Sequence, residues 1–268
     1  MRIVPAAIEK AVLKAYFSLQ TGAAIMTNIG VEHCTSFISS QFQAAEKSGA
    51  EIGIRRAVTI SRQAGCGALV VAEKLAKYLQ ESLPKQPVPW TVFDRNLMEK
   101  VLEDHDLPSR LAQFLPEDRV SYLEDIMADL LQVYPPSQTV IRQTTETILK
   151  LASLGNVILI GRGGNVITAR LPDMFHVRLV APLEQRIEHS HKSYGMTVAE
   201  ARRFCLREDL GRERYLKKYF HADINDATLY HLVINTGLIG YDNAAKLIGD
   251  AMLTLPRLQT WVGKEVMA

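Results

Sequence analysis

The chain has 268 residues and a mass of 29.9 kDa, which is long enough for one large domain or for two smaller ones with separate cores. Hydrophobic residues make up 47% and charged residues 22%, so the composition excludes a disordered chain and a fibrous repeat. The net charge of +2 argues against a nucleic-acid partner, because nonspecific binding to phosphates needs a clear excess of basic residues.

Neither a membrane nor an oxidising compartment is indicated by the sequence. Cys34, Cys66 and Cys205 are odd in number and far apart, which fits neither a disulfide framework nor a zinc site with C-x-x-C spacing. No apolar run approaches the roughly 18 residues that a membrane span needs. Charged residues occupy the stretch that would be apolar in a signal peptide: Glu9, Lys10 and Lys14. We therefore expect a cytoplasmic protein with no membrane partner.

Residues 1–56 differ in pattern from the rest of the chain. Apolar residues recur at helical spacing from Ile8 to Leu19, and a polar stretch follows up to Arg56. We interpret residues 1–56 as an appended N-terminal helical segment. It could pack on the main domain or mediate self-association into a homo-oligomer.

Strands alternate with helices along the remaining chain, residues 57–268. Short β-prone or apolar runs predict five strands, at residues 57–60, 88–93, 157–160, 175–180 and 232–234. Helical patterns lie between them, and the last ones begin near residues 137, 183, 198 and 242. This alternation predicts an α/β fold, in which helices cover both faces of a five-stranded parallel sheet. Ligand sites are then expected where the strands end at their carboxyl side.

The first glycine turn, residues 61–67, is the leading candidate site. Gly65 and Gly67 follow a strand and precede a helix, where free backbone N–H groups and the positive end of the helix dipole favour a phosphate. The pattern G-x-x-x-x-G-K-[ST] is not met, because Arg62, Ala68 and Leu69 occupy its first glycine, lysine and hydroxyl positions. From these residues alone, a purely structural tight turn remains an alternative.

Six ordered segments resemble motifs of the cytidylate-kinase-like family, a branch of the phosphate-loop nucleoside monophosphate kinases. The turn is similar to the motif I-S-R-x-x-G-S-G-G-R, and Phe93-Asp94-Arg95 to F-Y-D-R/K. The other four segments are similar to V-I-V-G-R-G, A-P-L-E-x-R-I-E, D-x-x-R-x-x-Y-x-x-Y-F and Y-D-L-V-I-N-T; they begin at residues 157, 181, 209 and 230.

The resemblance implies a fold, a reaction and a cofactor. The fold would be a P-loop NTPase-type three-layer sandwich over residues 57–268, with a helical lid at about 190–222. The reaction would be transfer of the γ-phosphoryl group of ATP, with Mg²⁺, to CMP, dCMP or a related nucleoside monophosphate. Such transfer depends on positioning and on charge stabilisation.

The resemblance also implies roles for particular residues. The ATP phosphates would bind at the turn, through Ser61, Gly65, Cys66, Gly67 and Ala68. The acceptor would bind near residues that follow strands or lie at the lid hinge: Asp94, Arg95, Arg162 and Arg186. Catalysis would depend on arginines of the turn and the lid: Arg62, Arg207 and Arg212. From the residues alone, Asp94 could equally be a helix N-cap, and the basic stretch 202–218 a solvated helix face.

The turn departs from the family motif at Cys66, Ala68 and Leu69, so it offers neither a lysine for the phosphates nor a hydroxyl for magnesium. Cys66 could be a low-pKa thiol at a helix N-terminus or a substitute for a small serine. The histidines contain no i,i+4 zinc pair, and we predict no metal ligand. An alternative function is therefore a catalytically silent nucleotide-binding or scaffold protein that retains the kinase fold.

Overall fold

The computed structural model describes residues 56–83, 88–94, 117–133 and 139–254, together with residues 37, 40, 111 and 115. Its centre is one parallel sheet in the order β2-β3-β1-β4-β5. The strands are β1 (Ala57–Arg62), β2 (Thr91–Phe93), β3 (Val157–Ile160), β4 (Met174–Val180) and β5 (Leu232–Asn235). Because β1 lies in the middle, the turn that follows it emerges at the centre of the carboxyl edge of the sheet.

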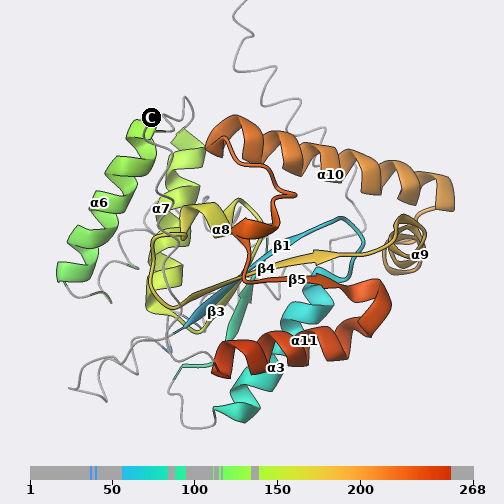
Figure 1. Cartoon of the computed structure of the whole chain (residues 1–268), viewed down its shortest axis with the longest axis horizontal. Coiled ribbons are helices and arrows are strands. Elements are labelled where there is room, and N and C mark those ends of the chain that lie inside the picture. The colour runs from blue at the N-terminus through green and yellow to red at the C-terminus, as the bar shows by residue number, and fades with distance from the viewer. Residues whose placement is uncertain are drawn as a thin grey trace, which may run out of the picture.

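Helices cover the sheet on both faces (Figure 1). They are α3 (Ala68–Ser82), α6 (Glu117–Val133), α7 (Thr139–Leu154), α8 (Gly164–Ile167), α9 (Leu183–Tyr194), α10 (Val198–Phe220) and α11 (Thr236–Thr254), with a 3₁₀ turn at Ala227–Leu229. One apolar cluster joins α3 and α11 to one face of the sheet. Another joins α6, α7, α8 and α10 to the other face. The result is a three-layer α/β/α arrangement.

The two faces of the central strand differ in chemistry. Val58 and Ile60 of β1 are fully buried against the apolar layer of α3 and α11. Alternate residues point the other way. There Thr59 Oγ1 lies 2.8 Å from His176 Nδ1, and Arg178 Nη1 donates to Ser61 Oγ at 3.0 Å. The face toward α8 and α10 therefore carries a buried polar row that ends at the carboxyl edge of the sheet.

The structure confirms the α/β class and the five-stranded parallel sheet. The third strand has the predicted bounds, whereas β2 is shorter than residues 88–93. The last helix consists of two pieces joined at a kink at Gly240: a first turn continues directly from β5 at Thr236, and the longer piece follows the kink, close to the predicted start near residue 242. The short helix α8 was not predicted. The N-terminal segment 1–56, apart from residues 37, 40 and 56, and most of 95–116 lie outside the described residues.

A search of the described helices finds none with the length and apolarity needed to cross a membrane.

The buried His176, which lies next to His231, predicts a pH-dependent stability. Burial, followed by the nearby His231, lowers the pKa of His176 from 6.5 to about 3, and burial also lowers the pKa of His231. Because the unfolded chain binds these protons more readily, stability falls as the pH drops from about 6.5 toward 3. We expect His176 to account for a loss of about 2 kcal/mol between pH 7 and pH 5.

Urea denaturation of the wild type and of His176→Gln at pH 7 and pH 5 measures this loss. The variant should show a clearly smaller decrease in the free energy of unfolding over this interval. Equal decreases in both proteins would contradict a neutral, buried His176.

Candidate functional site

The turn between β1 and α3 is built on two glycines in the left-handed region, Gly65 (φ 77°) and Gly67 (φ 76°). A Cβ atom at Gly65 would overlap the backbone of Arg186, and one at Gly67 would overlap the ring of Tyr241. Both the backbone conformation and the close packing therefore require glycine. Gly67 is the N-cap of α3, so the N–H groups of the first helical turn are directed toward the end of β1.

A bridge of two charged residues ties this turn to α9 and α10. The Ala64 N–H donates to Asp209 Oδ1 at 2.6 Å, and Arg186 Nη1 donates to Asp209 Oδ2 at 2.6 Å. Arg186 also donates to the carbonyl oxygens of Ala64 and Ala181 at 3.1 and 3.0 Å, and its side chain is buried. The Arg186–Asp209 bridge therefore fixes the turn to both helices.

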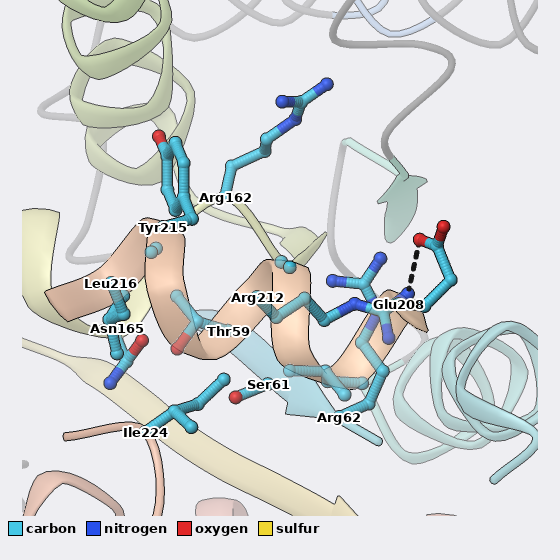
Figure 2. A pocket seen from close by; sticks show the side chains of 15 residues that line it. Thr59, Ser61, Arg62, Arg162, Asn165, Glu208, Arg212, Tyr215, Leu216 and Ile224 are labelled. Carbon is cyan, nitrogen blue, oxygen red and sulfur yellow. Dashed lines mark ion pairs between the residues drawn. The ribbon is translucent and has the colours of Figure 1, made fainter. Parts of the chain in front are cut away.

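A cavity of about 220 Å³ lies beside the turn, at the carboxyl ends of β1 and β3 and against α10 (Figure 2). Its lining comes from three segments: Thr59, Ile60, Ser61 and Arg62 of β1; Gly161, Arg162, Gly163, Gly164 and Asn165 after β3; and Glu208, Gly211, Arg212, Tyr215 and Leu216 of α10, with Ile224 beyond. We call it the arginine cavity, because three of these side chains carry guanidinium groups.

Two of the three guanidinium groups lie together. Figure 2 shows Arg62 and Arg212 close to each other and to Glu208, whose carboxylate lies 3.5 Å from Arg212 Nη2. Arg62 reaches this place by crossing Gly161, where a Cβ atom would overlap its guanidinium group. Arg212 Nη1 also donates to Asp209 Oδ1 at 3.2 Å, which links this pair to the Arg186–Asp209 bridge.

The third guanidinium group belongs to Arg162 and extends in another direction. Arg162 has a φ of 57° between the left-handed glycines 161 and 163. In Figure 2 its side chain rises past Tyr215, away from Arg62 and Arg212. Positive charge in the arginine cavity is therefore concentrated at Arg62 and Arg212, which suits an anion with more than one charged oxygen.

A second cavity of about 160 Å³ adjoins the turn on the side of α9 and α11. It is lined by Gly65, Cys66, Ala181, Gln185, Thr236, Gly237, Gly240 and Tyr241. Thr236 Oγ1 donates to Cys66 O at 2.9 Å, and Tyr241 Oη lies 3.1 Å from His189 Nδ1. The two cavities share no lining residue, and together they flank the segment from β1 into the turn.

Cys66 is not a low-pKa thiol. Burial raises its pKa from 9.0 to about 11, against the lowering effect of Arg62. Its side chain is 1% exposed and packs in the apolar cluster of α3 and α11. It therefore takes the place of a small buried residue in the turn.

The predicted site residues fall into three groups. Ser61, Arg62, Arg162 and Arg212 line the arginine cavity, and Gly65 and Cys66 line the second cavity. The remaining described site residues line neither cavity. Gly67 and Ala68 lie at the start of α3, Asp94 follows β2, and Arg186 is buried in the bridge. The Arg207 side chain is 62% exposed and lies 3.8 Å from Glu208. Arg95 lies outside the described residues.

The sequence did not single out the carboxylates of Glu208 and Asp209, or Asn165 and Tyr241, as site residues. Asp209 lies in the family-like motif D-x-x-R, which was a usable signal. Glu208 is nearly buried between arginines, and Tyr241 is placed by the bend at Gly240. No sequence pattern indicates the burial of Glu208 or the position of Tyr241, because both depend on how elements distant in sequence pack together.

Side-chain ligands for Mg²⁺ are not gathered within the described part of the chain, where no group of three or more His, Cys, Asp or Glu residues could hold a metal ion. The carboxylates nearest the turn, Glu208 and Asp209, are engaged by arginines. Leu69, at the position of the usual hydroxyl, packs with the apolar cluster of α3 and α11. The described residues therefore offer no preformed cluster of three or more such ligands.

Two sequence relatives and one solved structure show what the chain is similar to. It is 33% identical over 107 residues to a uronate isomerase from Corynebacterium glutamicum, covering 40% of this chain but 20% of that protein. It is 29% identical over 185 residues to a cytidylate kinase from Methanothrix thermoacetophila, covering 67% of this chain and 88% of that protein. A crystal structure of an uncharacterized protein from Eubacterium ventriosum matches its fold.

The crystal structure of the Eubacterium ventriosum protein has a TM-score of 0.57 and 18% sequence identity to this chain, and the match covers 75% of this chain and 99% of the other. The profile of the cytidylate kinase-like family matches residues 57–238, which is more than half of the chain. This region contains the turn and most of the lining of both cavities. The chain therefore belongs to the cytidylate kinase-like family.

Proposed function

We propose that this protein is an ATP-dependent nucleoside monophosphate kinase that transfers a phosphoryl group to CMP, dCMP or a similar acceptor. One observation carries the proposal: a glycine turn at the end of the central strand adjoins a cavity that contains Arg62 and Arg212 side by side. The turn suits the phosphates of the donor, and the guanidinium groups suit the anion that receives the phosphoryl group. The cytidylate kinase relatives supply the acceptor class.

The donor is placed at the turn. The N–H groups from Gly65 to Ala68 would bind the triphosphate, since these groups and the dipole of α3 favour negative charge. The second cavity adjoins Gly65 and Cys66 and would hold the base of the donor. Mg²⁺ supplies charge neutralisation in such reactions, but the described residues give it no side-chain site, so we assign it no protein ligand.

The acceptor is placed in the arginine cavity. Arg62, Arg162 and Arg212 would bind its phosphate, with Arg62 and Arg212 nearest the donor and Ser61 at the cavity wall. Asp94 and Arg95 follow β2, next to β3 in the sheet, and would contact the acceptor from that side. No general base is needed, because the attacking group is a phosphate oxygen.

The segment of about 190–222 would act as the lid. Closing it would exclude water and add positive charge near the transferred group, with Arg207 brought in from the outer face of α10. Arg186 would act as a positioning residue, because it holds the turn, α9 and Asp209 together rather than lining a cavity. Arg62 would replace the missing lysine of the turn.

A silent nucleotide-binding or scaffold protein is the second candidate function. It is favoured by Ala68 and Leu69, which bring no charge or hydroxyl to the turn, and by Asp209, which already accepts the N–H of Ala64. In this alternative the carboxylate stays on the turn and the cavity binds a nucleotide without transfer. The two functions differ in turnover, not in fold.

Turnover with ATP and each of CMP, dCMP and UMP separates these functions. We expect the wild type to phosphorylate a cytidine acceptor, and Arg212→Gln to lower kcat about 100-fold, because one guanidinium group is lost from the charged transition state. Arg203→Gln, on the exposed face of the same helix, is the matched control and should retain wild-type kcat. Nucleotide binding with no turnover for any acceptor would favour the silent protein.

The Arg186–Asp209 bridge predicts a stability effect. Asp209→Ala leaves the buried Arg186 without its carboxylate, and we expect the free energy of unfolding to fall by about 2 kcal/mol, less than for a fully buried pair because the Asp209 side chain is 26% exposed. Urea denaturation measures the change, and Glu213→Ala on the exposed side of α10 should stay within about 0.5 kcal/mol of the wild type. Equal stability of all three proteins would show that the bridge does not hold the turn.

A further inference from the structure

Asn165 is a buried amide whose donor has no partner. It is the second residue of α8, its side chain is 5% exposed, and its Nδ2 atom is buried without a hydrogen bond to any of the described residues. It lines the arginine cavity, and Figure 2 shows it between Leu216 and Ile224, apart from Arg62 and Arg212. A buried amide that donates to nothing is costly, so such a group calls for a bound acceptor.

Two nearby buried polar side chains, in contrast, donate to the protein. Thr168, at the end of the same helix, donates its hydroxyl to Gly164 O at 2.7 Å. Asn156, which precedes β3, donates its Nδ2 to Val88 O at 2.8 Å. The Nδ2 atom of Asn165 differs from these two donors, and Asn165 lines the arginine cavity.

The arginine cavity is divided chemically. Arg62 and Arg212 lie on one side, whereas Asn165 shares the other with the apolar side chains of Leu216 and Ile224. Ser61, in the wall, accepts from Arg178 Nη1 and from Tyr230 Oη, so its own hydroxyl proton is available to a ligand. The side of the cavity that contains Asn165 suits an uncharged part of a ligand, because it offers neutral polar atoms beside apolar carbon atoms. The side that contains Arg62 and Arg212 suits the phosphate of the same ligand.

We propose that Asn165 is a specificity-determining residue that donates from Nδ2 to a sugar hydroxyl of the acceptor monophosphate. A carboxamide offers a donor and an acceptor, and a hydroxyl offers the same two functions in return. The C–H surface of the sugar would pack on Leu216 and Ile224. This inference rests on the proposed function, because it takes the phosphate of the same ligand to lie at Arg62 and Arg212.

Calorimetric binding of CMP, dCMP, 2′,3′-dideoxy-CMP and UMP to the full-length protein tests this role. We expect the wild type to bind CMP about tenfold more tightly than the analogue that lacks the recognised hydroxyl, as the loss of one hydrogen bond implies. Asn165→Leu should bind CMP about tenfold more weakly, while its affinity for the dideoxy analogue stays within twofold of the wild type. The preference for CMP over UMP should not change.

Two controls separate recognition from structure. Because Asn165 Nδ2 makes no hydrogen bond within the described part of the chain, the thermal midpoint of Asn165→Leu without ligand should not fall, whereas Thr168→Val should lower the midpoint and keep the sugar preference. If Asn165→Leu does not fold, Asn165 has a structural role and the inference is wrong. Asn165→Ser, which shortens the donor, provides a second measurement of the sugar preference.

The outcomes distinguish this inference from the proposed function. Wild-type protein that binds no monophosphate overturns both. If the wild type binds CMP, and Asn165→Leu weakens the binding of CMP and of the dideoxy analogue equally, only the role of Asn165 is overturned. If Asn165→Leu changes only the preference for CMP over UMP, Asn165 contacts the base of the acceptor, and the sugar assignment is overturned.

Discussion

The Arg186–Asp209 bridge is the interaction on which the candidate site depends. One guanidinium group holds the carbonyl oxygens of Ala64 and Ala181 and the carboxylate of Asp209, which in turn accepts the N–H of Ala64. Three elements distant in sequence are thereby fixed within hydrogen-bonding reach of one turn. Without this bridge, the glycine turn would still follow β1, but neither α9 nor α10 would be held against it, and Arg212 would lose a partner that places it in the cavity.

The site also shows how positive charge can be placed beside the glycine turn when the helix that follows it supplies none. Residues 68 and 69 of α3 are apolar, so the usual cation is missing at the start of that helix. Arg62 at the end of β1 and Arg212 on α10 supply guanidinium groups instead, and Glu208 forms an ion pair with Arg212. Guanidinium groups keep their charge when buried and bind two oxygens at once, which makes them suitable replacements for an ammonium group.

The sequence was informative wherever a local pattern decided the structure. A continuous apolar run predicted β3, because a strand buried on both faces needs no polar alternation, and a mixed run predicted β4. The turn was predicted from two glycines with a strand before and a helix after. The paired carboxylates, the bend of α11 and the orphan amide of Asn165 were not predicted, because each arises where α8, α9, α10 and α11 meet the sheet. The family resemblance pointed to Arg62, Arg162 and Arg212, but it could not show that Arg162 extends away from the other two.

The passage of Arg62 over Gly161 has an evolutionary consequence. A side chain at position 161 and an extended arginine at position 62 exclude each other, since both would occupy the same volume. Gly161 is therefore retained here for a second reason beyond its left-handed φ of 88°. Across a large set of homologous sequences, we expect these two positions to covary, so that chains with a bulkier residue at 161 carry a shorter or differently directed side chain at 62.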